Sequence, residues 1–161
     1  MPDDSRTVAL SQGNFEQSIL LEHQRAREDF GVVPLVWDAA LARDAYRWAA
    51  EMARTDAFKH SPKSWRSSRQ GENIWYGSRG AFSYTTMAKS FTDEVRFFRP
   101  GRFPQVSSTG NWADVGHYTA IIWPTTTHVG CAVASNARYD YLVCRYNPSG
   151  NIDGVHLSAA R

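Results

Sequence analysis

The fold is most constrained by two strand-like segments near the carboxyl end, each of which carries one of the only two cysteines in the chain. They read VGCAV around Cys131 and YLVCRY around Cys144, and both are rich in residues that strands favour. An antiparallel hairpin with its turn centred between Ala137 and Arg138 places the cysteines opposite one another, because the numbers of facing residues have a constant sum. Facing alpha carbons lie roughly 4.5–5.5 Å apart, which overlaps the range that a disulfide tolerates. We therefore expect the fold to be built on this hairpin.

Size and composition are those of a single folded domain. A chain of 161 residues is as long as one ordinary domain and can bury a sizeable core. Apolar residues make up 42% of it, and six tryptophans and eight phenylalanines supply large surfaces for burial. This composition excludes a disordered chain.

Charge and hydropathy exclude two further classes of protein. The 18 basic and 16 acidic residues give a net charge of +2, and no basic run is interleaved with aromatic residues as in single-strand binders. We expect no nucleic-acid partner. No apolar run approaches the roughly 20 residues that span a bilayer, so the protein is expected not to be transmembrane. We expect a monomer.

The sequence gives two signals about location. Its amino terminus, MPDDS, lacks the basic and apolar regions of a signal peptide, so the protein is cytosolic or has a signal that is not part of this sequence. Two cysteines in paired strands favour an oxidising compartment, which indicates a secreted, extracellular or periplasmic protein.

Three stretches have apolar residues at spacings of three and four, the pattern of helices packed on a core. They are 16–30, 39–55 and 85–98. The middle stretch is the clearest because Asp38 can cap its start. The third ends before Pro100 and carries Glu94 on its apolar side. A fourth, shorter helix should carry His117 and stop at Pro124.

The remaining segments complete a layered arrangement. We expect an extended segment at 32–37, where proline biases the backbone away from helix. The segment 56–84 is rich in Ser, Gly, Pro and Arg and is predicted to be a loop with at most one short strand near 58–60. Helices around a few antiparallel strands imply an α+β domain at 16–161 that follows an N-terminal extension at 1–15.

Several segments carry a family resemblance. Residues 116–123 (GHYTAIIW) resemble the first signature of the CAP superfamily, which comprises the cysteine-rich secretory, antigen 5 and pathogenesis-related 1 proteins, and residues 141–152 (YLVCRYNPSGNI) resemble its second. The sequences GENI at 71–74 and DEV at 93–95 extend the resemblance over about residues 19–154. CAP domains are α–β–α sandwiches, so the resemblance implies a small antiparallel sheet between helices.

The resemblance also implies a cleft that holds a metal ion. Four residues lie beside the matched segments: His60, Glu72, Glu94 and His117. By the resemblance, the two histidines bind a divalent ion, zinc or a similar metal, weakly and directly, while the two glutamates lie nearby and often act through water. Without the resemblance each residue is a weak signal, because a lone His or Glu is more often hydrogen-bonded or solvated, and the four match no local zinc motif. Glu72 and Glu94 are the candidate catalytic bases if the protein is an enzyme.

The chain departs from the family in its cysteines. Many secreted relatives carry more cysteines than the two present here, so only the hairpin disulfide between Cys131 and Cys144 carries over. The cysteine-rich tail of some relatives does not follow in this sequence, so their ion-channel-blocking role is not supported.

Three functions stay open at this point. The preferred one is a secreted binding module whose cleft, or a neighbouring apolar groove, holds a small apolar ligand such as a lipid or sterol, or a peptide. The second is a metal-dependent, peptidase-like hydrolase in which the ion activates a water molecule. The third is an interaction protein in which the His and Glu cluster stiffens the fold. The first is preferred because the sequence shows no recognisable donors for a developing oxyanion.

Other residues receive less specific interpretations. The residues expected to form an apolar groove are Trp75, Tyr76 and Phe82. The remaining histidines are expected at the surface or as caps, namely His23, His128 and His156. Ser61 lies beside His60 but lacks the strained Gly-x-Ser-x-Gly turn of a nucleophile.

Overall fold

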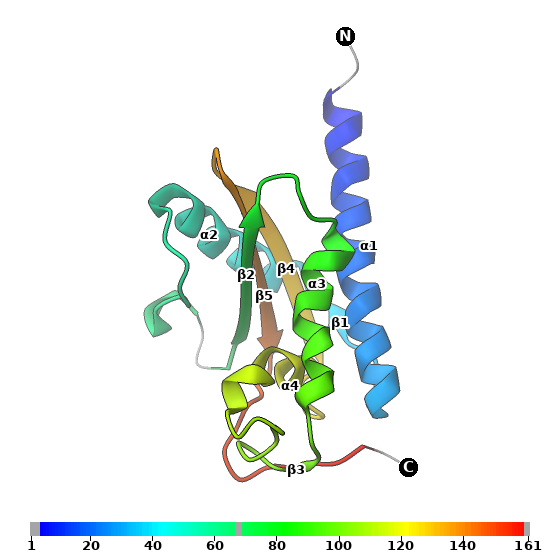
Figure 1. The fold of residues 1–161 in the computed structure, drawn as a ribbon. Helices are drawn as coiled ribbons and strands as arrows, with labels where there is room; N and C mark the ends of the chain where they lie inside the picture. Colours follow the sequence, from blue (N-terminus) through cyan, green and yellow to red (C-terminus); the bar gives the residue numbers. More distant parts are fainter. Residues whose placement is uncertain (1–3, 67–68, 160–161) are drawn as a thin grey trace.

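The computed structural model describes residues 4–66 and 69–159, which fold into three layers with a sheet in the middle (Figure 1). Helices α1, α3 and α4 cover one face of the sheet, and α2 covers the other. The helices are α1 (Asp4–Phe30), α2 (Ala39–Thr55), α3 (Tyr84–Thr92) and α4 (Gly116–Ile122), with 3₁₀ turns at η1 (Lys63–Trp65), η2 (Asp93–Phe97) and η3 (Trp112–Asp114). The strands are β1 (Val36–Trp37), β2 (Gly71–Ser78), β3 (Gly101–Arg102), β4 (His128–Ser135), β5 (Tyr139–Asn147) and β6 (His156–Leu157). The predicted α–β–α sandwich is confirmed.

The predicted hairpin forms from β4 and β5. The main sheet has the order β1-β4-β5-β2, in which β1 runs parallel to β4 and the other neighbours are antiparallel; β3 and β6 form a separate ribbon. Facing residues of the hairpin keep a constant sum, which centres the turn between Ala137 and Arg138. Cys131 faces Cys144 with alpha carbons 4.1 Å apart, and their sulfurs are bonded.

Strand β2 shows that the loop predicted at 56–84 was wrong. Eight residues of this segment form β2, which pairs along its whole length with β5, whereas 58–60 is irregular. Two features obscured the strand: glycines occur within it, and its first buried side chains, Glu72 and Asn73, are polar. A strand is recognised by alternating apolar residues, so buried polar residues remove that signal.

Helix α1 is longer than predicted. It begins at Asp4 instead of Glu16 and contains 27 residues. Periodicity reveals only the turns that face a core, and among residues 14–30, the part of α1 whose side chains the structure describes, the first buried residue is Ile19. Whether residues 1–15 form an extension to the domain stays a prediction, and the first three lie outside the described residues.

Helix α3 is shorter than predicted. It ends at Thr92 instead of Phe98, and the chain continues as the 3₁₀ turn η2, which contains Glu94. The tighter turn changes which side chains face inward: Phe91 is buried and Val95 is 51% exposed. Helix α2, in contrast, has the predicted bounds and is capped by the Asp38 carboxylate.

Two apolar cores lie on opposite faces of the sheet because side chains alternate along β5. Leu142 and Cys144 face the core shared with α1, α3 and α4, whereas Tyr141 and Val143 face α2. Every residue of β5 from Asp140 to Tyr146 is buried, so this strand is the centre of the molecule.

The contact between α2 and β4 depends on a glycine. A β-carbon added at Gly130 would lie 2.3 Å from the backbone nitrogen of Ala42 and 2.5 Å from the carbonyl oxygen of Asp38. Only glycine lets a helix and a strand approach this closely.

Buried polar residues fix α1 to the rest of the fold. The fully buried Arg27 guanidinium donates hydrogen bonds to the carbonyls of Val33, Ile121, Trp123 and Thr126. It thereby satisfies carbonyls at the carboxyl end of α4 that have no partner within the helix.

His23 is also fully buried, so its expected surface or capping position is wrong. Its Nδ1 donates to the carbonyl of Ile19 (2.8 Å), and its Nε2 accepts from the Tyr146 hydroxyl (2.7 Å). Burial, assisted by the charge of Arg27, outweighs the bond to Ile19 and lowers the pKa of His23 from 6.5 to about 4. The imidazole is neutral in the folded protein at neutral pH.

Removal of the disulfide is expected to weaken the fold without abolishing it. The bond joins residues separated by only 13 positions, so it removes limited entropy from the unfolded chain. The double change Cys131→Ala with Cys144→Ala should lower the free energy of unfolding by about 2–3 kcal/mol, measured by urea unfolding followed by tryptophan fluorescence. Reductant should leave this variant unchanged. A wild-type protein whose stability did not respond to reductant would contradict the prediction.

Candidate functional site

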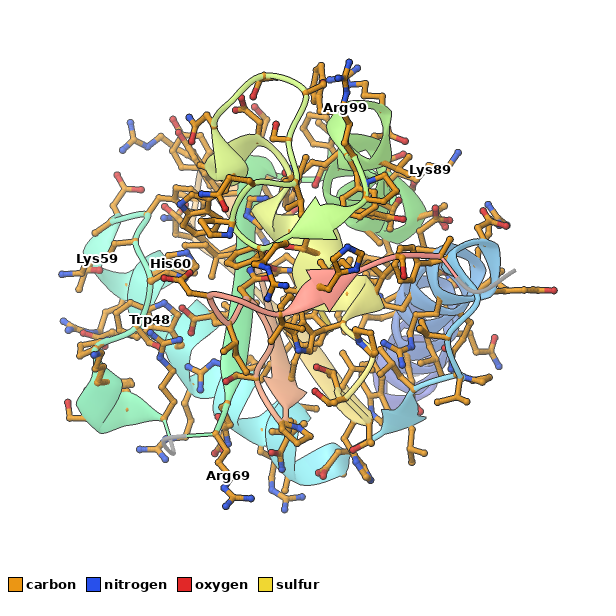
Figure 2. The ribbon with its side chains drawn as sticks, turned by 90° about the horizontal axis from the view of Figure 1, so that it is seen from below. Trp48, Lys59, His60, Arg69, Lys89 and Arg99 are labelled. Carbon is orange, nitrogen blue, oxygen red and sulfur yellow. A yellow bond between two sulfur atoms is a disulfide. The ribbon has the colours of Figure 1, made fainter. Side chains whose placement is uncertain are left out.

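A cleft of about 440 Å³ opens where β2 begins and β5 ends. Glu72 is the second residue of β2, His117 lies in the first turn of α4, and His60 belongs to the segment that follows α2. We call this cleft the His60–His117 cleft. Figure 2 views the molecule from below, with His60 well apart from Lys89 and Arg99. Other lining residues are Arg66, Gln70, Gly71, Asn73, Trp112, Ala113, Gly116, Ala120, Tyr146, Ser149, Gly150 and Asn151.

His60 is paired with Glu72. The Nδ1 of His60 donates to Oε1 of Glu72 at 2.8 Å, with the histidine side chain 56% exposed and the glutamate side chain fully buried. The carboxylate also accepts the Ser61 backbone N–H (2.9 Å) and the Ser61 hydroxyl (2.6 Å). Because its hydroxyl donates to the Glu72 carboxylate and its side chain is buried, Ser61 holds the loop in place.

Arg145 balances the buried charge of Glu72. The two residues face each other across β2 and β5, and Arg145 Nε donates to Glu72 Oε2 at 2.8 Å with both side chains fully buried. Arg145 also donates to Ser61 Oγ (3.2 Å) and to Oε1 of Gln70 (3.0 Å). A buried ion pair is tolerated only when further hydrogen bonds satisfy both partners, and here they do.

The surroundings of Glu72 keep it ionised. Burial by itself raises the pKa of its carboxyl, but hydrogen bonds from His60 and Ser61, together with the Arg145 charge, outweigh burial and lower the pKa from 4.5 to about 2. Burial also lowers the pKa of Arg145 against the pull of Glu72. The guanidinium nevertheless stays protonated, because its ordinary pKa lies far above neutral pH.

His117 is paired with Glu94 in the same way. Its Nδ1 donates to Oε2 of Glu94 at 2.7 Å, while Oε1 accepts the backbone N–H groups of His117 (2.9 Å) and Tyr118 (3.0 Å). The start of α4 has no side-chain cap of its own, so Glu94 caps this helix from η2. The Phe91 ring stacks on the imidazole at 4.9 Å. The orientation of His117 is therefore set by three elements.

Both histidines offer the same free atom. In the described residues, side-chain hydrogen bonds engage only Nδ1 of His60 and of His117. A carboxylate at Nδ1 places the proton there and leaves the lone pair on Nε2. Each imidazole can therefore act as a metal ligand through Nε2.

The four predicted residues are grouped as two pairs. Metal sites require several His, Cys, Asp or Glu side chains with their ligand atoms close together. Within residues 4–66 and 69–159, one group of three such residues has all its ligand atoms within 4.8 Å of one another, namely His23, Cys131 and Cys144. Those two sulfurs are bonded to each other and are not free to bind an ion. Both imidazoles line the His60–His117 cleft, and an ion bound to either Nε2 would have its other positions open to water.

A buried polar network behind the cleft was missed from the sequence. The Asn73 amide donates to the carbonyl of His117 (3.0 Å) and to the Tyr146 hydroxyl (3.1 Å), which in turn donates to His23. Recognition of β2 would have found a different buried contact, the Glu72–Arg145 pair, since the register of β2 with β5 places these two residues opposite each other.

The three aromatic residues expected to form a groove lie on two faces of β2. Trp75 packs against Phe82 with ring centroids 5.2 Å apart. Tyr76 lies on the opposite face beside Phe58 at 4.6 Å and Tyr141 at 5.9 Å. Tyr76 and Phe82 are 44% and 41% exposed, respectively. A ligand groove formed by Trp75, Tyr76 and Phe82 stays a prediction.

Replacement of Glu72 by glutamine should destabilise the protein at neutral pH. The variant leaves the buried Arg145 charge unpaired, so the free energy of unfolding should fall by about 3–5 kcal/mol. Since the folded pKa of Glu72 lies below its unfolded value, the wild-type carboxylate contributes fully above pH 4.5, and this contribution is lost as the pH falls toward about 2. Urea unfolding of both proteins as a function of pH should show their stabilities converge over this window.

His23 provides an internal control for that experiment. Its folded pKa of about 4 lies below the ordinary value of 6.5, so both proteins should lose the same stability as the pH falls between these values. A stability difference between the two proteins that stayed constant down to pH 2 would refute the assignment to Glu72.

Comparisons with known proteins confirm the family resemblance. The family model for the cysteine-rich secretory proteins, CAP, matches residues 20–146. Pathogenesis-related protein PR-1 of Medicago truncatula is 33% identical over 144 residues, which cover 88% of this chain and 78% of that protein. Venom allergen 5.02 of Dolichovespula maculata is 33% identical over 125 residues, which cover 73% of this chain and 55% of that protein.

Solved structures share the fold. BmVAL-1 has a TM-score of 0.75 at 22% identity and covers 92% of this chain and 83% of its own. NaASP2, in a crystal structure with Zn²⁺, has a TM-score of 0.74 at 22% identity and covers 90% of this chain and 85% of its own. The sequence matches and the shared sandwich lead to one conclusion: the chain belongs to the CAP family of cysteine-rich secretory proteins.

Proposed function

We propose that this protein is a secreted binding module whose His60–His117 cleft holds a divalent metal ion, zinc or a similar ion, on the Nε2 atoms of both histidines. The observation that carries the proposal is the carboxylate at each Nδ1, at 2.8 Å from Glu72 and 2.7 Å from Glu94. Carboxylate–histidine pairs of this kind fix the tautomer, aim the ring and raise its basicity as a ligand.

The donor set fits a weakly held ion. Imidazole nitrogen is a good ligand for zinc, and the open positions would be taken by water. Two protein ligands hold an ion less firmly than the four of a closed structural site. NaASP2, which shares the fold, was crystallised with Zn²⁺, and the proposal for this chain rests on its own histidines.

The cleft favours binding over hydrolysis. A general base should have a pKa near the working pH, whereas the pKa of Glu72 is about 2 and its oxygens already accept four hydrogen bonds. Glu94 is engaged by two backbone N–H groups and one imidazole. Both carboxylates therefore position neighbouring groups and are poorly placed to take a proton from water.

The shape of the cleft suggests the kind of ligand. A volume of about 440 Å³ accommodates a small molecule or the end of a longer one. Trp112, at 47% exposure, offers an apolar wall, and Arg66 adds a positive charge. A bound ion would supply a further positive centre. We infer that the ligand combines an anionic group with an apolar body, as a fatty acid or the carboxyl end of a peptide does.

Two features support a secreted protein. The disulfide between Cys131 and Cys144 is of the kind that persists in oxidising compartments, and the family is that of cysteine-rich secretory proteins. Within the described residues, no helix has the length and apolarity that would let it cross a membrane.

Zinc binding should depend on both histidines. Isothermal titration of the wild-type protein near neutral pH is expected to show weak binding, which the double change His60→Ala with His117→Ala should abolish. Affinity should also decrease on acidification, because a protonated imidazole cannot bind a metal. His156→Ala is the matched control, since His156 is exposed on β6 outside the cleft. Equal zinc binding by the wild type and the double variant would show that zinc does not bind at His60 and His117.

Glu94→Gln separates orientation from ligation. If Glu94 acts through His117, zinc affinity should fall by about 10–100-fold and not vanish. Complete loss of zinc binding in a folded Glu94→Gln protein would instead make the carboxylate a direct ligand.

Ligand retention should exceed turnover. Purified protein with and without zinc should retain labelled fatty acid, sterol or peptide after gel filtration and should leave broad peptide and ester libraries uncleaved. Trp112→Ala should reduce retention by about tenfold, in line with the loss of a half-buried aromatic surface. Turnover that disappears in Glu72→Gln or Glu94→Gln, without retained ligand, would favour the hydrolase.

A further inference from the structure

Strand β4 has an outer edge that is only partly covered. Strand β1 pairs with His128 and Val129 alone, although β4 continues to Ser135. The carbonyl of Val129 accepts the Asp38 N–H at 2.8 Å and therefore points toward the β1 side. The N–H and C=O groups of alternate residues point to the same side of a strand, so those of Cys131 and Val133 face the open edge. No strand among the described residues pairs with them.

A groove of about 700 Å³ runs along this edge. One wall is α1 and the start of α3, where the rings of Phe15 and Tyr84 are 5.0 Å apart. The other wall is α2, which contributes Ala42 and Tyr46. The groove shares no lining residue with the His60–His117 cleft. Figure 1 shows β4 lying between α1 and α2, the helices that form most of these walls.

The charges of the groove are unequal. Arg43 and Arg47 project from the α2 wall, both are exposed, and neither forms an ion pair within the described residues. Arg47 lies over the Trp65 ring at 5.9 Å from its centroid. Glu16 is the single acidic residue that lines the groove in the described part of the chain. The positive charge is thus concentrated on one wall.

We propose that this edge binds an extended, acidic peptide segment of a partner protein, which adds a strand to the sheet beside β4. Backbone groups of the peptide would pair with those of Cys131 and Val133, as in other cases of strand addition. Side chains of a strand alternate between its two faces. Acidic side chains would therefore meet Arg43 and Arg47 on the α2 wall, and apolar ones would meet Phe15 on the α1 wall.

Other occupants match the groove less well. A second copy of this chain would bring its own arginines to the same edge across a two-fold axis, so like charges would meet. An acyl chain would offer no partners to the edge N–H and C=O groups or to the guanidinium groups. An acidic extended peptide satisfies the backbone edge, the charges and the apolar wall together.

The probe for this proposal is a fluorescein-labelled heptapeptide of alternating valine and aspartate, titrated with the wild-type protein in fluorescence anisotropy. Binding should weaken by about tenfold or more when alternate peptide amides are N-methylated, because the strand hydrogen bonds are then lost. It should weaken similarly when lysine replaces aspartate. Zinc should have no effect, since the cleft is separate. Equal binding of the N-methylated peptide would overturn strand addition.

Two protein variants test the groove itself. The double change Arg43→Glu with Arg47→Glu should weaken binding by about tenfold or more, whereas Arg99→Glu, which lies outside the groove, should not. Val133→Pro removes an N–H from the open edge and spares the bonds to β5, so it should abolish binding at an unchanged melting temperature. If Val133→Pro fails to fold, the comparison of the N-methylated and unmodified peptides on the wild-type protein still tests strand addition.

The alternative occupants give distinct outcomes. Sedimentation tests for a second copy at this edge. If the wild-type protein is a dimer, if Arg99→Glu leaves the dimer intact, and if the Arg43→Glu, Arg47→Glu double variant is a monomer, the edge binds a second copy and the proposal is overturned. Displacement of the peptide by a fatty acid at equal concentration would assign the groove to lipid and overturn it as well. A monomer that retains the peptide in the presence of fatty acid supports the proposal.

Discussion

The fold depends on one buried ion pair, Glu72 with Arg145, which lies between neighbouring strands of the sheet. Both side chains are fully buried, so each charge needs the other and needs further partners as well. Those partners determine the local structure: Glu72 ties down the loop that carries His60 and Ser61, and Arg145 reaches Gln70 before β2. The residues that keep the pair satisfied are therefore the ones that build one side of the cleft.

Glu94 has the same positioning role at the other side of the cleft. It caps α4 from a different element and holds the ring of His117, just as Glu72 holds the ring of His60. In both pairs the carboxylate holds the histidine ring in position through Nδ1, which leaves the lone pair on Nε2 free to bind a ligand. A site of this kind is suited to holding an ion or a ligand group. The hydrogen bonds that hold Glu72 in place also lower the pKa of its carboxyl, so Glu72 is a poor proton acceptor.

The sequence predicted the features that rest on local patterns. The hairpin and its register followed from two strand-like segments and their cysteines, and α2 from its apolar periodicity and the Asp38 cap. Strand β2 could not be predicted, because buried Glu72 and Asn73 are explained only by partners distant in sequence. The four cleft residues came from family resemblance, and no spacing could show that they would be arranged as two separate pairs. The groove beside β4 exists because β1 ends after two residues, and no pattern in the sequence predicts where β1 ends.

The beginning of α2 explains why that groove exists. Asp38 caps the helix, and its own N–H still bonds to Val129 of β4, so the chain leaves the sheet after only two residues of β1. The helix that follows presses its first turn against Gly130, where its backbone leaves no room for a side chain. This contact packs α2 against β4, so the helix forms a wall of the groove while no strand among the described residues pairs with the edge beyond Val129. The close packing of α2 on β4 and the uncovered edge from Cys131 to Ser135 are thus two consequences of one short strand.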